Sequence, residues 1–134
     1  MMPTMDAIRL VLEGDPRIAY ALLFGSAARG TAHPQSDVDV AVGLAAGAQL
    51  SPRDLGTLVA DLERAAGRPI DLVLLGDAPA PLAFRIFRDG VPLVERDHQA
   101  LADRKARAIL EYLDFRPLEA LLAQGVLTSA ARGR

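Results

Sequence analysis

Gly25, Ser26, Asp37 and Asp39 are residue types that together can bind a phosphorylated ligand and a cation. Aspartates two positions apart in a strand project from the same side, so the Asp37 and Asp39 side chains lie close together. Two such carboxylates repel each other unless a positive group joins them, and Mg²⁺ typically binds one or two carboxylates together with substrate phosphates. Glycine permits close approach to the backbone, while free N–H groups at a helix start and the Ser26 hydroxyl favour phosphate. The segment therefore predicts a phosphate cradle beside a metal-binding pair.

Asp71 is a third acid that fits this scheme, because it interrupts the apolar segment 69–75. An ionised carboxylate in such a segment is costly unless it is paired, bound to metal or exposed at an edge. If this strand lies beside that of Asp37 and Asp39, the three acids converge and can hold two metal ions about 3.5–4 Å apart, an arrangement used for in-line phosphoryl displacement. Other interpretations stay open: the acids can be solvated strand residues, and Gly25 can be a simple turn residue.

The elements that must position these residues alternate between helix-like and strand-like apolar periodicity, which predicts a mixed α/β domain. The predicted strand 91–94 contains Pro92, which favours an edge position in the sheet. Pro117 is expected to break or kink the last helix, with a final turn or two after it. The predicted helices are 4–12, 25–29 (a single turn), 51–66, 83–89 and 97–115, and the predicted strands are 18–24, 37–42, 70–75 and 91–94.

The last predicted helix carries an apolar face that a small domain can use for its own core. This face consists of Ala102, Ala106, Ile109 and Leu113. A cluster of basic residues on the same helix, Arg104, Lys105 and Arg107, is expected to form a solvated face. Tyr112 and Phe115 fit either the core or a docking surface for another protein.

Composition limits the class of protein. The chain has 134 residues, of which 51% are hydrophobic and 24% charged, with no cysteine and a formal net charge of -2. A single domain, 1–134, is predicted, with a core at about 18–96 and a C-terminal helical segment at about 97–124. The hydrophobic fraction argues against disorder, the lack of cysteine excludes disulfides, and the net charge argues against a broad nucleic-acid-binding surface. No apolar segment is long enough to predict a membrane span, and nothing at the N-terminus resembles a secretion signal, so a cytoplasmic location is expected.

The spacing of Gly25-Ser26, ten residues and then Asp37-x-Asp39 resembles the signature of the DNA polymerase β-type nucleotidyltransferase superfamily. Asp71 matches the third carboxylate of that superfamily. The short chain is similar to the MNT group of minimal nucleotidyltransferases, a similarity that extends over 84–97 and 111–115. The resemblance implies an α/β (α+β) fold with a mixed sheet of about four strands, flanked by helices and followed by a C-terminal helix.

The resemblance also implies a Mg²⁺-dependent transfer of AMP from ATP to a hydroxyl, with release of pyrophosphate. Two Mg²⁺ ions would be held by the carboxylates, and Asp71 would serve the side of the acceptor. The implied catalytic residues and metal ligands are Asp37, Asp39 and Asp71. The residues implied to hold the triphosphate are Gly25, Ser26 and Arg29, although Arg29 fits a local ion pair equally well.

Members of the MNT group serve as antitoxins to HEPN-domain ribonucleases, and some transfer AMP to a tyrosine of that toxin. The resemblance thus implies a HEPN toxin as the partner and a protein tyrosine as the acceptor, with neither a membrane nor nucleic acid as a partner. Two alternatives remain: an antitoxin that acts by docking alone with a vestigial site, and an enzyme that modifies a small molecule such as an aminoglycoside.

Overall fold

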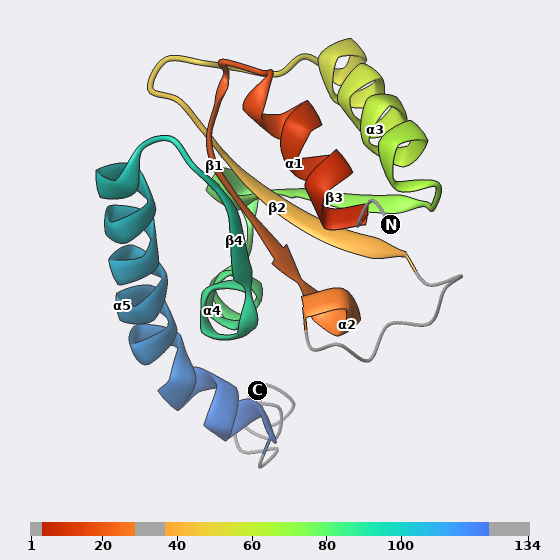
Figure 1. Ribbon diagram of the computed structural model, residues 1–134. Helices are drawn as coiled ribbons and strands as arrows, with labels where there is room; N and C mark the ends of the chain where they lie inside the picture. Colours follow the sequence, from red (N-terminus) through yellow and green to blue (C-terminus); the bar gives the residue numbers. More distant parts are fainter. Residues whose placement is uncertain (1–3, 29–36, 124–134) are drawn as a thin grey trace.

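The computed structural model describes residues 4–28 and 37–123, which form a four-stranded sheet with helices on both faces (Figure 1). The helices are α1 (Thr4–Glu13), α2 (Gly25–Ala28), α3 (Pro52–Ala66), α4 (Ala80–Asp89) and α5 (His98–Ala123), with a 3₁₀ turn at Leu75–Asp77. The strands are β1 (Ile18–Phe24), β2 (Val38–Leu44), β3 (Ile70–Leu74) and β4 (Val91–Glu95). The predicted mixed α/β fold is confirmed.

The strands are arranged in the order β3-β2-β1-β4. β1 pairs with β2 and with β4 in antiparallel fashion, whereas β2 and β3 are parallel. The edge position predicted for the Pro92 strand is confirmed, because β4 is the outermost strand next to β1. The two central strands are also the two that lead to the predicted site: Gly25 directly follows β1, and β2 begins one residue after Asp37.

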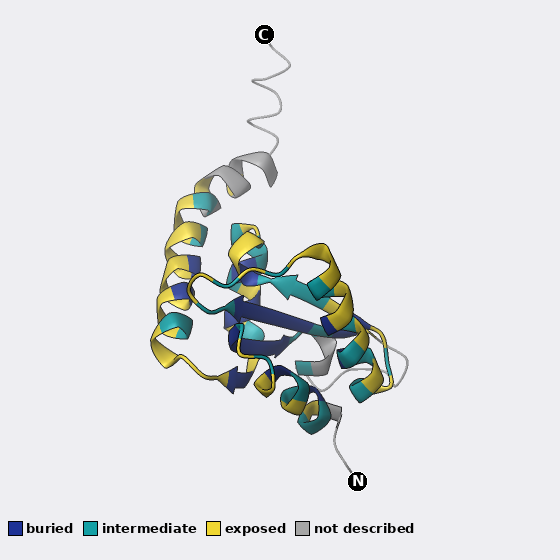
Figure 2. Ribbon diagram, turned by 90° about the horizontal axis from the view of Figure 1, so that it is seen from above, coloured by how far each residue is buried: buried dark blue, intermediate teal, exposed yellow. Residues whose placement is uncertain are grey.

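The sheet separates two apolar layers, as the alternation of residues in β2 predicts. Val38, Val40 and Val42 face one layer, where they pack with residues of α1 and α3. Ala41 faces the other layer, which includes residues of α4 and α5. Figure 2 shows the sheet as the most deeply buried part of the molecule, with the helices exposed on their outer sides. Asp39 alternates with the valines and therefore belongs to the face covered by α4.

Helix α3 shows why the local sequence determines this part of the fold. The Ser51 side chain accepts a hydrogen bond from the Asp54 backbone N–H, and the Asp54 side chain accepts one from the Ser51 backbone N–H, which forms a capping box. Pro52 occupies the first turn, where its missing N–H removes no helical bond. Gly67 ends the helix with φ +68°, a left-handed conformation that suits glycine.

Helix α5 differs from its prediction in two respects. It continues to Ala123, so it passes through Pro117 instead of ending before it. In addition, the predicted inward face is exposed, including Ile109 (38% exposed) and Leu113 (45% exposed). The helix turns its Arg104 and Ala108 side toward the sheet instead.

The burial of Arg104 contradicts the prediction that it belongs to a solvated face, since only 8% of this residue is exposed. Its aliphatic stem packs in the layer while Nη2 donates a hydrogen bond of 2.9 Å to the Leu75 carbonyl oxygen. The rings of Tyr112 and Phe84 stack with centroids 4.2 Å apart, which joins α5 to α4. The apolar pattern of the sequence does not predict the packed face of α5, because the arginine Arg104 occupies a position on that face where a hydrophobic residue is expected.

None of the helices in the described part of the chain has an apolar segment long enough to cross a membrane.

Candidate active site where β1 and β2 meet

Gly25 lies at the junction of β1 and α2 in a conformation that favours glycine, with φ +72°. A Cβ atom at this position would overlap Oδ2 of Asp39. The Asp39 carboxylate therefore lies directly against the Gly25 Cα, at the place where β2 runs beside the end of β1. The register of the two strands, in which Phe24 is opposite Asp39, brings these residues together.

Asp39 and Asp71 are direct register partners on the parallel strands β2 and β3. Neighbouring strands lie about 4.7–4.9 Å apart, and side chains of register partners project from the same face. The condition stated for convergence, that the Asp71 strand lies beside the Asp39 strand, is therefore met. Asp37 precedes β2 by one residue, and the side chains of Asp37 and Asp71 are exposed while that of Asp39 is half-buried.

The sequence further predicts that, with these strands side by side, the three acids converge and can hold two metal ions. Among the residues that the structure describes, no group of three histidine, cysteine, aspartate or glutamate side chains is close enough to hold a metal ion. The backbone places Asp39 and Asp71 side by side, but their side chains and that of Asp37 do not form a three-ligand cluster. The chemistry of the donor set nevertheless fits Mg²⁺, because all donors are carboxylate oxygens at neighbouring backbone positions.

The triphosphate-binding prediction can be followed only in part. Gly25 is described, whereas the side chain of Ser26 lies outside the described part of the structure. The same is true of Arg29, within the range 29–36. The roles of these two side chains therefore remain predictions.

A pocket of about 390 Å³ opens beside Gly25, between the end of β1 and α4. Its lining consists of Phe24, Gly25, Leu82, Arg85, Arg88 and Asp89. This volume lies within the range of about 300–1,000 Å³ typical of small-molecule sites. The pocket is on the same face of the sheet as Asp39, since Phe24 and Asp39 are register partners and α4 covers that face.

The two arginines of this pocket were missed by reasoning from the sequence, although a signal was available. Arg85 and Arg88 are three positions apart and follow Leu82 at the same spacing, which defines a helix face different from the buried one of Ala83, Ile86 and Phe87. Recognising that face as a site required knowledge that α4 packs next to Gly25.

The charges of the two arginines are balanced differently. Arg88 donates two hydrogen bonds of 2.9 Å to the Asp89 carboxylate, which raise the pKa of Arg88 above its usual value. The Arg88 guanidinium also lies 5.8 Å from the centre of the Phe84 ring. In contrast, the exposed Arg85 guanidinium forms no hydrogen bond or ion pair with any described residue. The pocket therefore contains one neutralised and one available cation.

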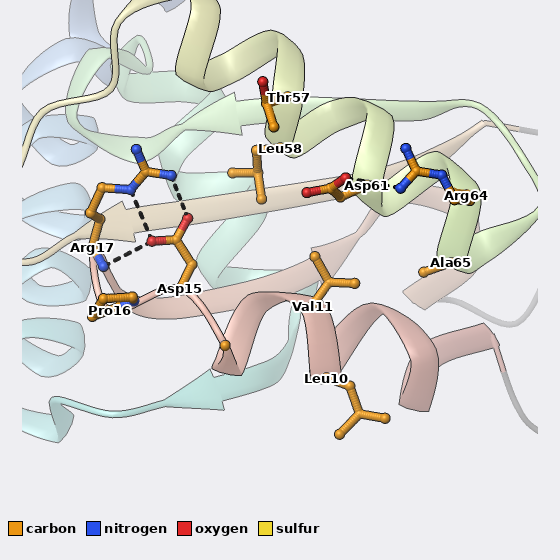
Figure 3. Close-up of a pocket in the computed structure, with 11 residues that line it drawn as sticks. Leu10, Val11, Asp15, Pro16, Arg17, Thr57, Leu58, Asp61, Arg64 and Ala65 are labelled. Atoms are coloured by element: carbon orange, nitrogen blue, oxygen red, sulfur yellow. Dashed lines mark hydrogen bonds and ion pairs between the residues drawn. The ribbon is translucent and has the colours of Figure 1, made fainter.

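A larger pocket of about 780 Å³ lies between α1 and α3, on the opposite face of the sheet (Figure 3). Its charged groups are already paired: Arg17 with Asp15 at 2.8 Å, and Arg64 with Asp61 at 3.1 Å. The hydrogen bonds from Arg17 hold the pKa of Asp15 below its usual value. Although this pocket is larger, the valines of β2 and the layer around them separate it from Asp39. The smaller pocket is therefore the better candidate for a ligand site, because it adjoins Gly25 and contains an arginine available for an anion.

A glycine against an aspartate at the end of a strand, beside a second aspartate on the neighbouring strand, fits the class of enzymes that act on metal-bound phosphate groups. Comparison with protein families supports this class: residues 6–99 match the family "Polymerase beta, Nucleotidyltransferase". The chain belongs to this family and is a nucleotidyltransferase.

Solved structures show the same fold. A toxin–antitoxin structure with AMP-PNP has a chain with 25% identity and a TM-score of 0.79, and the match covers 92% of this chain and 98% of that one. The MNT antitoxin in complex with a tri-AMPylated HEPN toxin from Shewanella oneidensis has 22% identity and a TM-score of 0.73, with coverage of 92% and 96%. A structure assigned to a minimal nucleotidyltransferase has 30% identity and a TM-score of 0.56, with coverage of 66% and 92%. Comparison with curated proteins found no match.

Proposed function

We propose that this nucleotidyltransferase moves AMP from ATP to a tyrosine hydroxyl of a HEPN toxin and so acts as its antitoxin. The observation that carries the proposal is the position of the Asp39 carboxylate, which lies against Gly25 and beside its register partner Asp71. The similarity to antitoxin chains over 92% of this chain supports the choice of partner. In this proposal the partner supplies the acceptor hydroxyl.

In the proposed reaction, the tyrosine oxygen attacks the α-phosphorus of ATP from the side opposite the bridging oxygen. The new O–P bond forms as the bond between the α-phosphorus and that bridging oxygen breaks, and pyrophosphate leaves. Asp37 and Asp39 would hold Mg²⁺, which when bound neutralises charge on the phosphates and on the leaving group. Asp71 would serve the acceptor side, with its carboxylate accepting the tyrosine proton. Gly25 leaves room for the Asp39 carboxylate against the backbone. The use of ATP as the donor is consistent with the predicted cytoplasmic location.

The test uses the full chain mixed with a HEPN toxin that it binds, ATP and Mg²⁺, followed by intact-mass analysis of the toxin. We expect the toxin to gain the mass of one or more AMP groups. Asp39→Asn removes the charge at constant size and should lower transfer by roughly 100-fold or more, because charge stabilisation is a large part of such catalysis. Asp61→Asn, which removes a carboxylate on α3 at the opposite face of the sheet, is the matched control and should leave transfer unchanged.

Two results would contradict this proposal. A toxin that is neutralised without any gain in mass would indicate an antitoxin that acts by docking alone. Transfer by the Asp39→Asn protein at the rate of the Asp61→Asn protein would show that the chemistry takes place elsewhere.

A further inference from the structure

We infer that the pocket between the end of β1 and α4 binds the terminal phosphates of the nucleotide, and that Arg85 is the residue that recognises them. This inference rests on the proposed use of ATP and adds a residue that neither the family motif nor the sequence pattern identifies. Gly25 is shared by the pocket and the aspartate site, so a ligand that reaches Asp39 also extends into this pocket.

The distribution of charge around Gly25 fits a triphosphate bound to a cation. Gly25 contacts the Asp39 carboxylate, and Asp39 has Asp71 as its register partner, so these acids suit a metal ion near Gly25. Gly25 also lines the pocket that contains Arg85 and Arg88 of α4, which suit anionic oxygens. A triphosphate bound to a metal ion has both groups: the metal ion suits the carboxylates, and the oxygens of the terminal phosphates suit the arginines.

Arg85 is the residue available for this contact. Arg88 is already engaged in a bidentate pair with Asp89, which neutralises its charge within the pocket. Arg85 is exposed at the pocket and forms no side-chain hydrogen bond or ion pair within the described part of the chain. A guanidinium presents a planar set of N–H donors that matches two oxygens of a phosphate group, a geometry that a lysine ammonium lacks.

The pocket also has apolar side chains beside its arginines. Phe24 and Leu82 form walls beside the cation, and both belong to the apolar layer on this face of the sheet. Half-buried apolar side chains beside the guanidinium reduce its contact with water on that side, which strengthens its interaction with an anionic oxygen. Arg88 is held by Asp89 and lies over the Phe84 ring, so it keeps this part of the pocket wall in place.

The experiment measures binding of Mg²⁺–ATP and of AMP to the wild-type chain and to Arg85→Gln by calorimetry. Because Arg85 is exposed on a helix, the substitution should leave the fold and its stability nearly unchanged. Loss of a charge-assisted hydrogen bond should weaken ATP binding by about tenfold or more, while AMP, which lacks the terminal phosphates, should bind equally to both proteins. Arg53→Gln is the matched control: it removes the same charge from an exposed position of α3 on the opposite face of the sheet.

The outcomes separate this inference from the proposed function. If the wild-type chain transfers AMP but Arg85→Gln binds ATP as tightly as Arg53→Gln does, the inference is wrong and the proposed function stands. Equal weakening of ATP and AMP binding would place Arg85 at the nucleoside or the α-phosphate, which also overturns it. If Arg85→Gln binds ATP normally but loses affinity for the HEPN toxin, the pocket belongs to the protein acceptor. If the wild-type chain neither binds ATP nor transfers AMP, the proposed function itself fails.

Discussion

Gly25→Ala tests whether close contact between the backbone and Asp39 is required for chemistry. The added Cβ has two separate effects. The left-handed backbone, φ +72°, costs a residue with a Cβ about 1–2 kcal/mol, offset by about 0.4–1 kcal/mol from the lower entropy of the unfolded chain. The free energy of unfolding should therefore fall by about 1 kcal/mol. The Cβ also overlaps Oδ2 of Asp39, so the half-buried carboxylate must rotate away from its position.

Gly67→Ala isolates the first of these effects. Gly67 has nearly the same backbone conformation, φ +68°, but nothing lies within 4 Å of the position that its Cβ would occupy. Both variants should lose about 1 kcal/mol of stability in urea denaturation. Only Gly25→Ala should lose activity, by about 100-fold in the initial rate of AMP transfer at saturating ATP, because a displacement of about 1 Å in a catalytic group can have that effect.

The comparison has a clear negative outcome. Equal transfer rates for Gly25→Ala and Gly67→Ala, with both proteins folded, would refute the argument that the Asp39 carboxylate acts from its place against Gly25. A much larger loss of stability in Gly25→Ala would show instead that Asp39 cannot rotate, and the activity should then be measured at a temperature well below the melting transition of that variant.

Two predictions concern charged groups away from the site. Hydrogen bonds from Arg17 lower the pKa of Asp15 in the folded state, so the Asp15 carboxylate stabilises the fold above its unfolded pKa, about 3.9, and this stabilisation is lost as the pH falls through the lower folded pKa. In urea denaturation, Asp15→Asn should be less stable than wild type at pH 7, and the difference should shrink below about pH 4. A difference that does not change with pH would contradict this assignment. Burial lowers the pKa of Arg104, and its Nε and Nη1 have no hydrogen-bond partner among the described residues, while the Leu75 oxygen that it contacts also accepts from Ala78. Arg104→Met should accordingly match or exceed the wild-type free energy of unfolding, and a loss of more than about 2 kcal/mol would show a net stabilising role.

Much of the fold could be predicted from the sequence because the relevant signals are local. The segment 18–24 is continuously apolar, and β1 occupies those residues. Ser51, Pro52 and Gly67 form the predicted beginning and end of α3. The alternation of valine with aspartate in β2 also predicted which face carries Asp39. These features depend on periodicity and capping, which act within a few residues.

The parts that could not be predicted depend on contacts between distant segments. The inward face of α5 was assigned to the wrong residues, because the packed side includes Arg104, whose stem is apolar and whose tip finds a carbonyl of Leu75. The pocket arginines were missed because Arg85 belongs to α4 and Gly25 follows β1, and only the packed structure brings them to one pocket. The sequence also could not show that the Asp39 carboxylate rests on Gly25, since the strand register determines that contact.

The C-terminal helix extends the family fold in a way that affects the site. The family match ends at residue 99, close to the start of α5 at His98, so nearly all of this helix lies beyond it. Tyr112 nevertheless stacks on Phe84, the residue immediately before Arg85 in α4. This aromatic pair is therefore a direct packing contact between α5 and the helix that carries the pocket arginines. The opposite side of α5 exposes the apolar side chains Ile109, Leu110 and Leu113, so the same helix packs against α4 on one side and leaves apolar surface exposed on the other.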